Sequence, residues 1–198
     1  MHTYLFSLFF LSFCAIAQEH RGARPLPTES TPVYANTAEA ALIRAAAEGD
    51  AEAVRKHLSG TVNVLARDAL GDCALAAAVR GANIEIVRLL LRRGASPDVL
   101  GRGGYSALGL AAMRGYAEIA RALIDAGADV AIVSAHGNRP LHDAVVLNRV
   151  DIVKLLLAHG ARADATDQQG RTPLALALAH GHEATAKLLR AAARSRRS

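Results

Sequence analysis

Histidine, cysteine and acidic side chains are the groups in this sequence whose chemistry suits catalysis or metal binding. Seven histidines follow His2, and two of them, His136 and His142, lie close in sequence to Asp143. A zinc site needs three or four ligands at defined spacing, and no His–Glu or Cys–Cys pattern supplies them. We also find no Ser–His–Asp order, no phosphate-binding glycine loop and no paired carboxylates. The sequence therefore predicts a protein that is not an enzyme and that binds neither a cofactor nor a metal.

The remaining reactive groups are expected to have structural roles. His180 and His182 are expected to be solvated groups at the end of a helix. Cys73 has no base beside it in the sequence, and we expect a small packing residue.

The composition favours closely packed helices and does not indicate a nucleic-acid partner. Hydrophobic residues make up 52% of the chain but aromatic residues only 4%, and much of the apolar share is alanine. The net charge of +5 is concentrated at one end, because four of the 23 basic residues lie within the last nine positions. The rest of the chain is almost neutral, so the charge excess belongs to a tail: Arg190, Arg194, Arg196 and Arg197.

The N-terminus has the features of an export signal. An apolar run covers residues 4–17 and ends in Ala15-Ile16-Ala17, which is a small-x-small cleavage pattern. The run is short for a membrane span. We expect residues 1–17 to be a cleaved signal peptide. The alternatives are an uncleaved membrane anchor and lipid attachment at Cys14. Residues 18–36 are rich in proline, threonine and charge, and they predict a flexible linker.

A repeat of 33 residues organises the rest of the chain. Stepping back by 33 from Leu174 finds a leucine each time, and three residues after each leucine stands an alanine. Glycines followed by alanine recur in the same register at 94, 127 and 160. These glycines are placed to end a helix in the left-handed conformation. The leucines and alanines in register are Leu42, Leu75, Leu108, Leu141 and Leu174, with Ala45, Ala78, Ala111, Ala144 and Ala177.

The repeat resembles the ankyrin repeat. The best matches are DQQGRTPLALALAHG (167–181), GNRPLHDAVVLN (137–148) and GYSALGLAAMRGYAEIARALIDAGAD (104–129). The resemblance implies an all-α ankyrin-repeat solenoid of five stacked 33-residue helix-turn-helix units joined by β-turn fingers. Stacked units of this kind share one continuous core. The expected domain is 37–193, followed by a basic tail at 194–198, with repeats at about 37–66, 67–99, 100–132, 133–165 and 166–193.

Departures from the family pattern make further predictions. The family's motif histidine is present only as His142, for which we expect a structural role, and only the last repeat keeps Thr172-Pro173-Leu174. This loss predicts looser turns in repeats two and three, and the glycine-rich GRGGY (101–105) predicts a mobile finger. The terminal repeats carry Lys56 and Arg190 at positions that are apolar elsewhere, as expected of caps. Asn36 and Glu39 are expected to form a capping box.

Function is therefore expected on the surface. The resemblance implies partner binding through the turn tips and the concave surface of the first helices. Apolar residues surrounded by arginine on such a surface are typical of a binding hot spot. For Met113 and Leu147 the alternative role is packing between neighbouring repeats. The predicted partner-binding residues are Arg67, Leu70, Asp72, Arg80, Leu100, Arg102, Tyr105, Met113, Arg114, Val133, His136, Asn138, Asp143, Leu147 and Arg171.

The predicted function is non-catalytic protein–protein interaction, in the periplasm or after secretion. We expect a monomer that binds another protein and no nucleic acid, and that has no transmembrane segment after signal cleavage. The interpretations left open are an immunity-type inhibitor of an envelope toxin, a stabilising partner of an envelope enzyme, and a membrane-surface binder that uses the Arg-rich tail.

Overall fold

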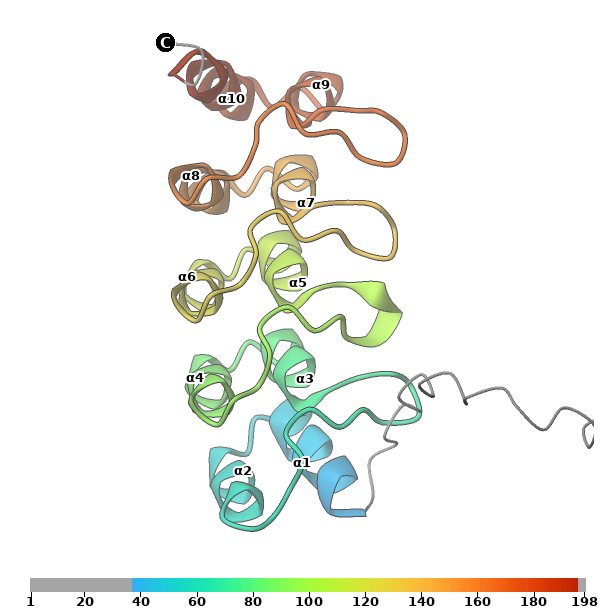
Figure 1. Cartoon of the computed structure of the whole chain (residues 1–198). Coiled ribbons are helices and arrows are strands. Elements are labelled where there is room, and N and C mark those ends of the chain that lie inside the picture. The colour runs from blue at the N-terminus through green and yellow to red at the C-terminus, as the bar shows by residue number, and fades with distance from the viewer. Residues whose placement is uncertain (1–36, 196–198) are drawn as a thin grey trace, which may run out of the picture. The chain divides into compact units, whose positions relative to one another are not determined.

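The computed structural model describes residues 37–195, which form two columns of helices (Figure 1). The predicted signal peptide, the linker with Asn36 of the capping box, and residues 196–198 lie outside this range. The described residues contain only isolated β-bridges and no strand, which confirms the all-α expectation. The first helices of successive repeats are α1 (Thr37–Glu48), α3 (Ala74–Arg80), α5 (Ala107–Arg114), α7 (Pro140–Val146) and α9 (Pro173–Ala179). The second helices are α2 (Ala51–Leu58), α4 (Ile84–Arg92), α6 (Ala117–Asp125), α8 (Val150–Ala158) and α10 (Glu183–Ser195).

Left-handed residues end the helices at the positions expected from the repeat. The first helix of the third repeat stops at Gly115, where φ is 83°. Ala82 and Asn148 occupy the equivalent position in the neighbouring repeats and also have positive φ, 58° and 51°. Non-glycine residues adopt this conformation at a cost in free energy, so the stacking of the repeats holds these two turns in place. The second helices α4, α6 and α8 stop at glycines with φ between 85° and 94°: Gly94, Gly127 and Gly160.

Side-chain caps begin three of the first helices. The side chains of Ser106, Thr172 and Cys73 stand at the same register position. Each accepts a hydrogen bond from the backbone N–H three residues further on, at 3.0, 3.2 and 3.5 Å. Such caps satisfy one of the donors left free at a helix start. Cys73 is buried, as expected of a packing residue, and it is also a helix cap.

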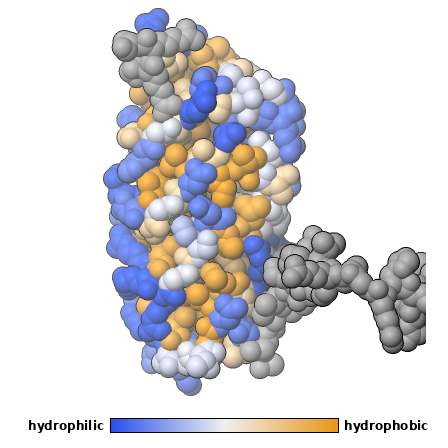
Figure 2. All heavy atoms as spheres, viewed as in Figure 1, coloured by the Kyte–Doolittle hydropathy of each residue, from blue (hydrophilic) through white to orange (hydrophobic). Residues whose placement is uncertain are grey.

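The core runs as one line through the stack. One leucine in each of four second helices has 0% of its surface exposed: Leu90, Leu123, Leu156 and Leu189. The first helices contribute their register alanines, which are also buried and let neighbouring helices approach closely. Figure 2 shows apolar residues along the middle of one face, with hydrophilic residues gathered on the margin formed by the second helices.

The two ends of the array differ from its middle. Lys56 and Arg190 are exposed, as expected of residues in terminal repeats. Leu178 is 52% exposed although Val145, at the same position one repeat earlier, is fully buried. The difference arises because no described repeat packs against α9 from the far side. Helix α10 continues to Ser195, two residues beyond the expected end of the domain.

Candidate protein-interaction surface

Each repeat after the first begins with a seven-residue turn, here called a finger and numbered by its repeat. These are the second (67–73), third (100–106), fourth (133–139) and fifth (166–172) fingers. Three fingers are closed by the same pattern of side-chain to backbone hydrogen bonds. One side-chain oxygen of Asp68, Ser134 and Asp167 accepts two backbone N–H groups, from the residues two and four positions further on. The donor–acceptor distances lie between 2.8 and 3.3 Å. This local bonding satisfies two backbone N–H groups of each turn from within the turn itself.

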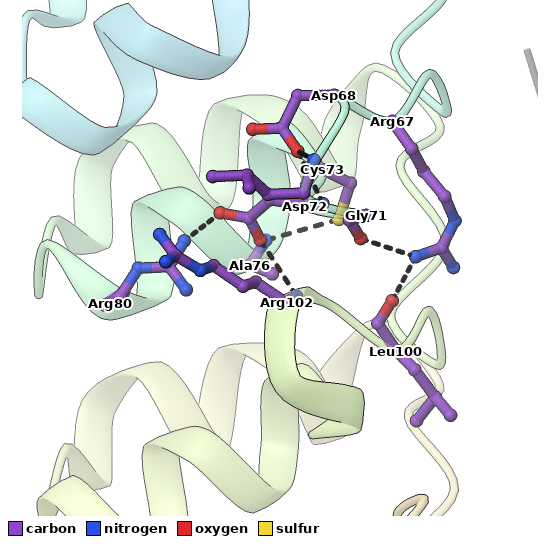
Figure 3. A network of polar contacts seen from close by, with 10 residues as sticks. Arg67, Asp68, Gly71, Asp72, Cys73, Ala76, Arg80, Leu100 and Arg102 are labelled. Carbon is purple, nitrogen blue, oxygen red and sulfur yellow. Dashed lines mark hydrogen bonds and ion pairs between the residues drawn. The ribbon is translucent and has the colours of Figure 1, made fainter. Parts of the chain in front are cut away.

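The third finger has Gly101 at this position and is held from the preceding repeat instead. A Cβ on Gly101 would lie 2.4 Å from Cβ of Ala76, so no larger residue fits. Oδ1 of Asp72, in the second finger, accepts a hydrogen bond from the Arg102 N–H at 3.2 Å. Its Oδ2 forms an ion pair with Arg80 (Figure 3). Both oxygens of this carboxylate therefore have partners within the protein.

A second contact joins the same two fingers. The guanidinium of Arg67 donates to the backbone carbonyls of Gly71 and Leu100 (Figure 3). The expectation of looser turns in repeats two and three was based on the missing threonine and histidine. In these repeats Cys73 and Ser106 cap the first helix at the position of Thr172, and Asp68, Asp72 and Arg67 add other hydrogen bonds within and between the two fingers.

The third and fourth fingers are joined by an aromatic contact and two hydrogen bonds. The rings of Tyr105 and His136 have centroids 4.8 Å apart at an interplanar angle of 48°. Nε2 of His136 is 2.8 Å from the Gly103 carbonyl. The backbone N–H of Ala135 donates to the Gly104 carbonyl at 2.9 Å. These contacts tie the glycine-rich segment, which includes the 3-10 helix η1 (Arg102–Gly104), to the next repeat.

One register position ties the helix pairs together. Asn83, Arg149 and His182 each stand immediately before a second helix. Through a side-chain nitrogen, each contacts a backbone carbonyl near the end of the first helix of the preceding repeat, at distances of 3.1 to 3.2 Å. The expectation that His182 is a solvated group was therefore wrong, because its Nε2 lies 3.2 Å from the Val146 carbonyl. The shared register position was the sequence signal for this role.

His142 and Asp143 lie side by side in α7, and both are buried. Nε2 of His142 is 3.2 Å from the Arg171 carbonyl in the next finger, which agrees with the expected structural role. Burial lowers the pKa of this imidazole, and the contact with the Arg171 carbonyl acts in the opposite direction. The ring therefore bridges two repeats and stabilises the stack.

The Asp143 carboxyl is the most perturbed acid in the described residues. The equivalent positions in neighbouring repeats carry Leu110 and Leu176, so this register normally faces an apolar environment. Asn138 donates a hydrogen bond to Oδ1 at 3.2 Å. Burial raises the pKa of Asp143 to about 7, although this hydrogen bond and the nearby His136 both lower it. The carboxyl therefore changes its charge near neutral pH.

The Asp143→Asn variant is expected to be more stable than the wild-type protein, by a margin that grows as the pH rises. Between pH 4 and pH 7 the folded chain keeps its Asp143 proton while the unfolded chain loses it. The wild-type protein therefore loses free energy of unfolding over this range and no further above it. Each pKa unit corresponds to about 1.4 kcal/mol, so the variant is expected to gain up to about 4 kcal/mol at pH 8.5 and little at pH 4. Urea denaturation at both pH values measures this difference.

Asp151→Asn is the matched control, because Asp151 is exposed on α8. We expect this control to change stability by less than about 0.5 kcal/mol at either pH. A gain for Asp143→Asn that is independent of pH would contradict the assigned cause.

The predicted partner-binding residues fall into three groups in the structure. The exposed members are Leu70, Arg102, Arg114, Val133, His136, Leu147 and Arg171, and the half-buried members are Arg67, Arg80, Leu100, Tyr105, Met113 and Asn138. Asp72 and Asp143 are buried, so their carboxylates act within the fold. Of the two residues with packing as an alternative role, Met113 is half-buried, whereas Leu147 is 46% exposed. We call the segments 67–80, 100–114, 133–147 and 166–180 together the finger surface.

Comparison with known families identifies the repeat. A family model described as ankyrin repeats (3 copies) matches residues 42–134, and another described as ankyrin repeats (many copies) matches residues 141–190. Together the two matches cover well over half of the chain. The chain belongs to the ankyrin-repeat family. Ankyrin repeats are generally protein–protein interaction modules, and the family is typically non-catalytic.

The described part of this ankyrin-repeat chain offers no metal site and no membrane span. Between residues 37 and 195, no group of three or more His, Cys, Asp or Glu side chains is placed to hold a metal ion. Over the same range no helix combines the length and the apolar character that crossing a bilayer requires.

Proposed function

We propose that this ankyrin-repeat protein is an exported binding module, periplasmic or secreted, that holds a partner protein against its finger surface. The exposure of large apolar residues there carries the proposal. Leu70, Val133 and Leu147 are 60%, 44% and 46% exposed, and arginines lie near them in the sequence. Apolar side chains beside arginine are the residue types that dominate binding free energies at protein interfaces. Inhibition of an envelope toxin and stabilisation of an envelope enzyme are two forms that such binding takes.

Substitution of two finger-surface leucines tests the proposal. The full chain carrying Leu70→Ser and Leu147→Ser is expected to bind its partner at least about 30-fold more weakly, because a central interface residue contributes about 2 kcal/mol or more. The measurement is recovery of bound protein by the tagged chain from its own host, followed by titration of the identified partner.

The chain also contains a matched control. Leu65 is exposed to a similar degree, 50%, and lies outside the finger surface. All three leucines are exposed, so each substitution is expected to change the free energy of unfolding by about 0.5 kcal/mol or less. Equal loss of binding in the Leu65→Ser variant would count against the finger surface as the binding site.

A further inference from the structure

The two sides of the stack differ in where their acidic residues lie. The second helices carry Glu52, Glu85, Glu118, Asp125, Asp151 and Glu183, and every one of these side chains is exposed. The finger surface has four acidic residues, all of them aspartates, and none is exposed to that degree. Within the described residues, no exposed acidic side chain lies in the finger-surface segments. The other exposed acidic residues are in α1 or in loops outside those segments: Glu48, Asp50, Asp98, Asp129 and Asp164.

The aspartates of the finger surface form hydrogen bonds or ion pairs within the protein itself. Asp72, Asp143 and Asp167 are only 4%, 5% and 6% exposed. They accept hydrogen bonds from the fingers or from side chains beside them, and Asp72 and Asp167 also form ion pairs with Arg80 and Arg171. The fourth, Asp68, is half-buried and accepts two backbone N–H groups through Oδ1.

The arginines of the same surface remain largely without counter-charges. The finger surface contains six arginines, and two of them are in these ion pairs. Arg102 and Arg114 are exposed, and no described carboxylate lies within ion-pair distance of either. Arg67 and Arg139 donate to backbone carbonyls, which satisfies hydrogen bonds but does not neutralise charge. The surface is therefore positive, with no competing exposed carboxylate.

We propose that the partner presents an acidic polypeptide segment with apolar side chains, whose carboxylates meet Arg102 and Arg114. This inference rests on the proposed function and specifies the chemistry of its partner. Complementary charge accelerates association and excludes basic partners. The exposed Leu70, Val133 and Leu147 favour a polypeptide over a nucleic acid, because a phosphate backbone offers no apolar side chains for them to bury.

Selection from a displayed library of random 12-residue peptides tests the charge of the partner. The wild-type full chain is the bait, and peptides still bound by the Leu70→Ser/Leu147→Ser variant are removed. The expected result is enrichment of peptides that combine several Asp or Glu residues with Leu, Ile or Phe. Enrichment of neutral or basic peptides would overturn the acidic partner and leave the proposed function intact. Failure to enrich any peptide sensitive to the two leucines would count against both.

Charge variants then locate the contact. Fluorescence anisotropy of the best peptide is measured with Arg102→Gln/Arg114→Gln, and with Arg88→Gln/Arg92→Gln as the control. Arg88 and Arg92 are also exposed but lie on the second-helix side, in α4. We expect binding at least 10-fold weaker in the first variant and unchanged in the second. The loss is expected to shrink as salt is raised.

Two results would overturn the charge assignment. One is an equal loss of peptide binding in both arginine variants. The other is binding of a single-stranded oligonucleotide as tight as that of the acidic peptide, which would indicate a general polyanion surface.

Discussion

Replacing Leu123 by alanine is expected to lower the free energy of unfolding of the array by about 2–5 kcal/mol. Leu123 in α6 has 0% of its surface exposed and lies in the line of core leucines that runs through the stack. Truncating this side chain leaves a cavity between neighbouring repeats. Helices that are packed against a repeat on each side cannot move together to fill it. Urea denaturation followed by circular dichroism measures the change.

Leu178→Ala is the control for this prediction. The same chemical change is made in a first helix of the terminal repeat, where the side chain is largely exposed. Little buried apolar area is lost there, and we expect a change of less than about 1 kcal/mol. Similar losses in the two variants would contradict the assignment of Leu123 to the shared core.

Gly104→Ala is expected to destabilise the protein by about 3 kcal/mol, and Gly170→Ala by about 1 kcal/mol. The two glycines occupy the same finger position and both have φ of 73°. A Cβ on Gly170 would meet nothing within 4 Å, so only the left-handed backbone penalises alanine there. A Cβ on Gly104 would lie 2.4 Å from Cβ of Ala135 in the next finger.

The difference between these two variants measures how closely the third and fourth fingers pack. Thermal unfolding of both variants beside the wild-type protein provides the comparison. Equal destabilisation would indicate that the fourth finger moves away from the added Cβ at no cost in free energy. It would contradict the close contact between Gly104 and Ala135.

The repeat register was the part of the fold that the sequence predicted well. Leucine and alanine recur every 33 residues because each repeat packs on a copy of itself, so the same position meets the same neighbour. The glycines predicted to end second helices, Gly94, Gly127 and Gly160, all have positive φ. A local pattern sufficed here because glycine adopts this conformation without help from a neighbouring repeat.

The burial of the two acidic residues in the predicted site did not follow from the sequence. Asp143 has room in the structure because Gly109 of the preceding repeat lacks a side chain: a Cβ there would lie 3.2 Å from Oδ2 of Asp143. Asp72 is buried where it bonds to the Arg102 N–H of the next finger and pairs with Arg80. Both placements depend on contacts between different repeats, and a residue's own position in the repeat does not reveal them.

The measurement that tests the central claim most directly is photo-cross-linking from single positions of the full chain in its host. A photoreactive amino acid replaces Leu147 on the finger surface in one variant and Lys154 on the second-helix side in another, both exposed positions. Partner binding through the finger surface predicts a discrete covalent adduct from position 147 and none from position 154. An adduct from position 154 alone, or equal adducts from both positions, would contradict it.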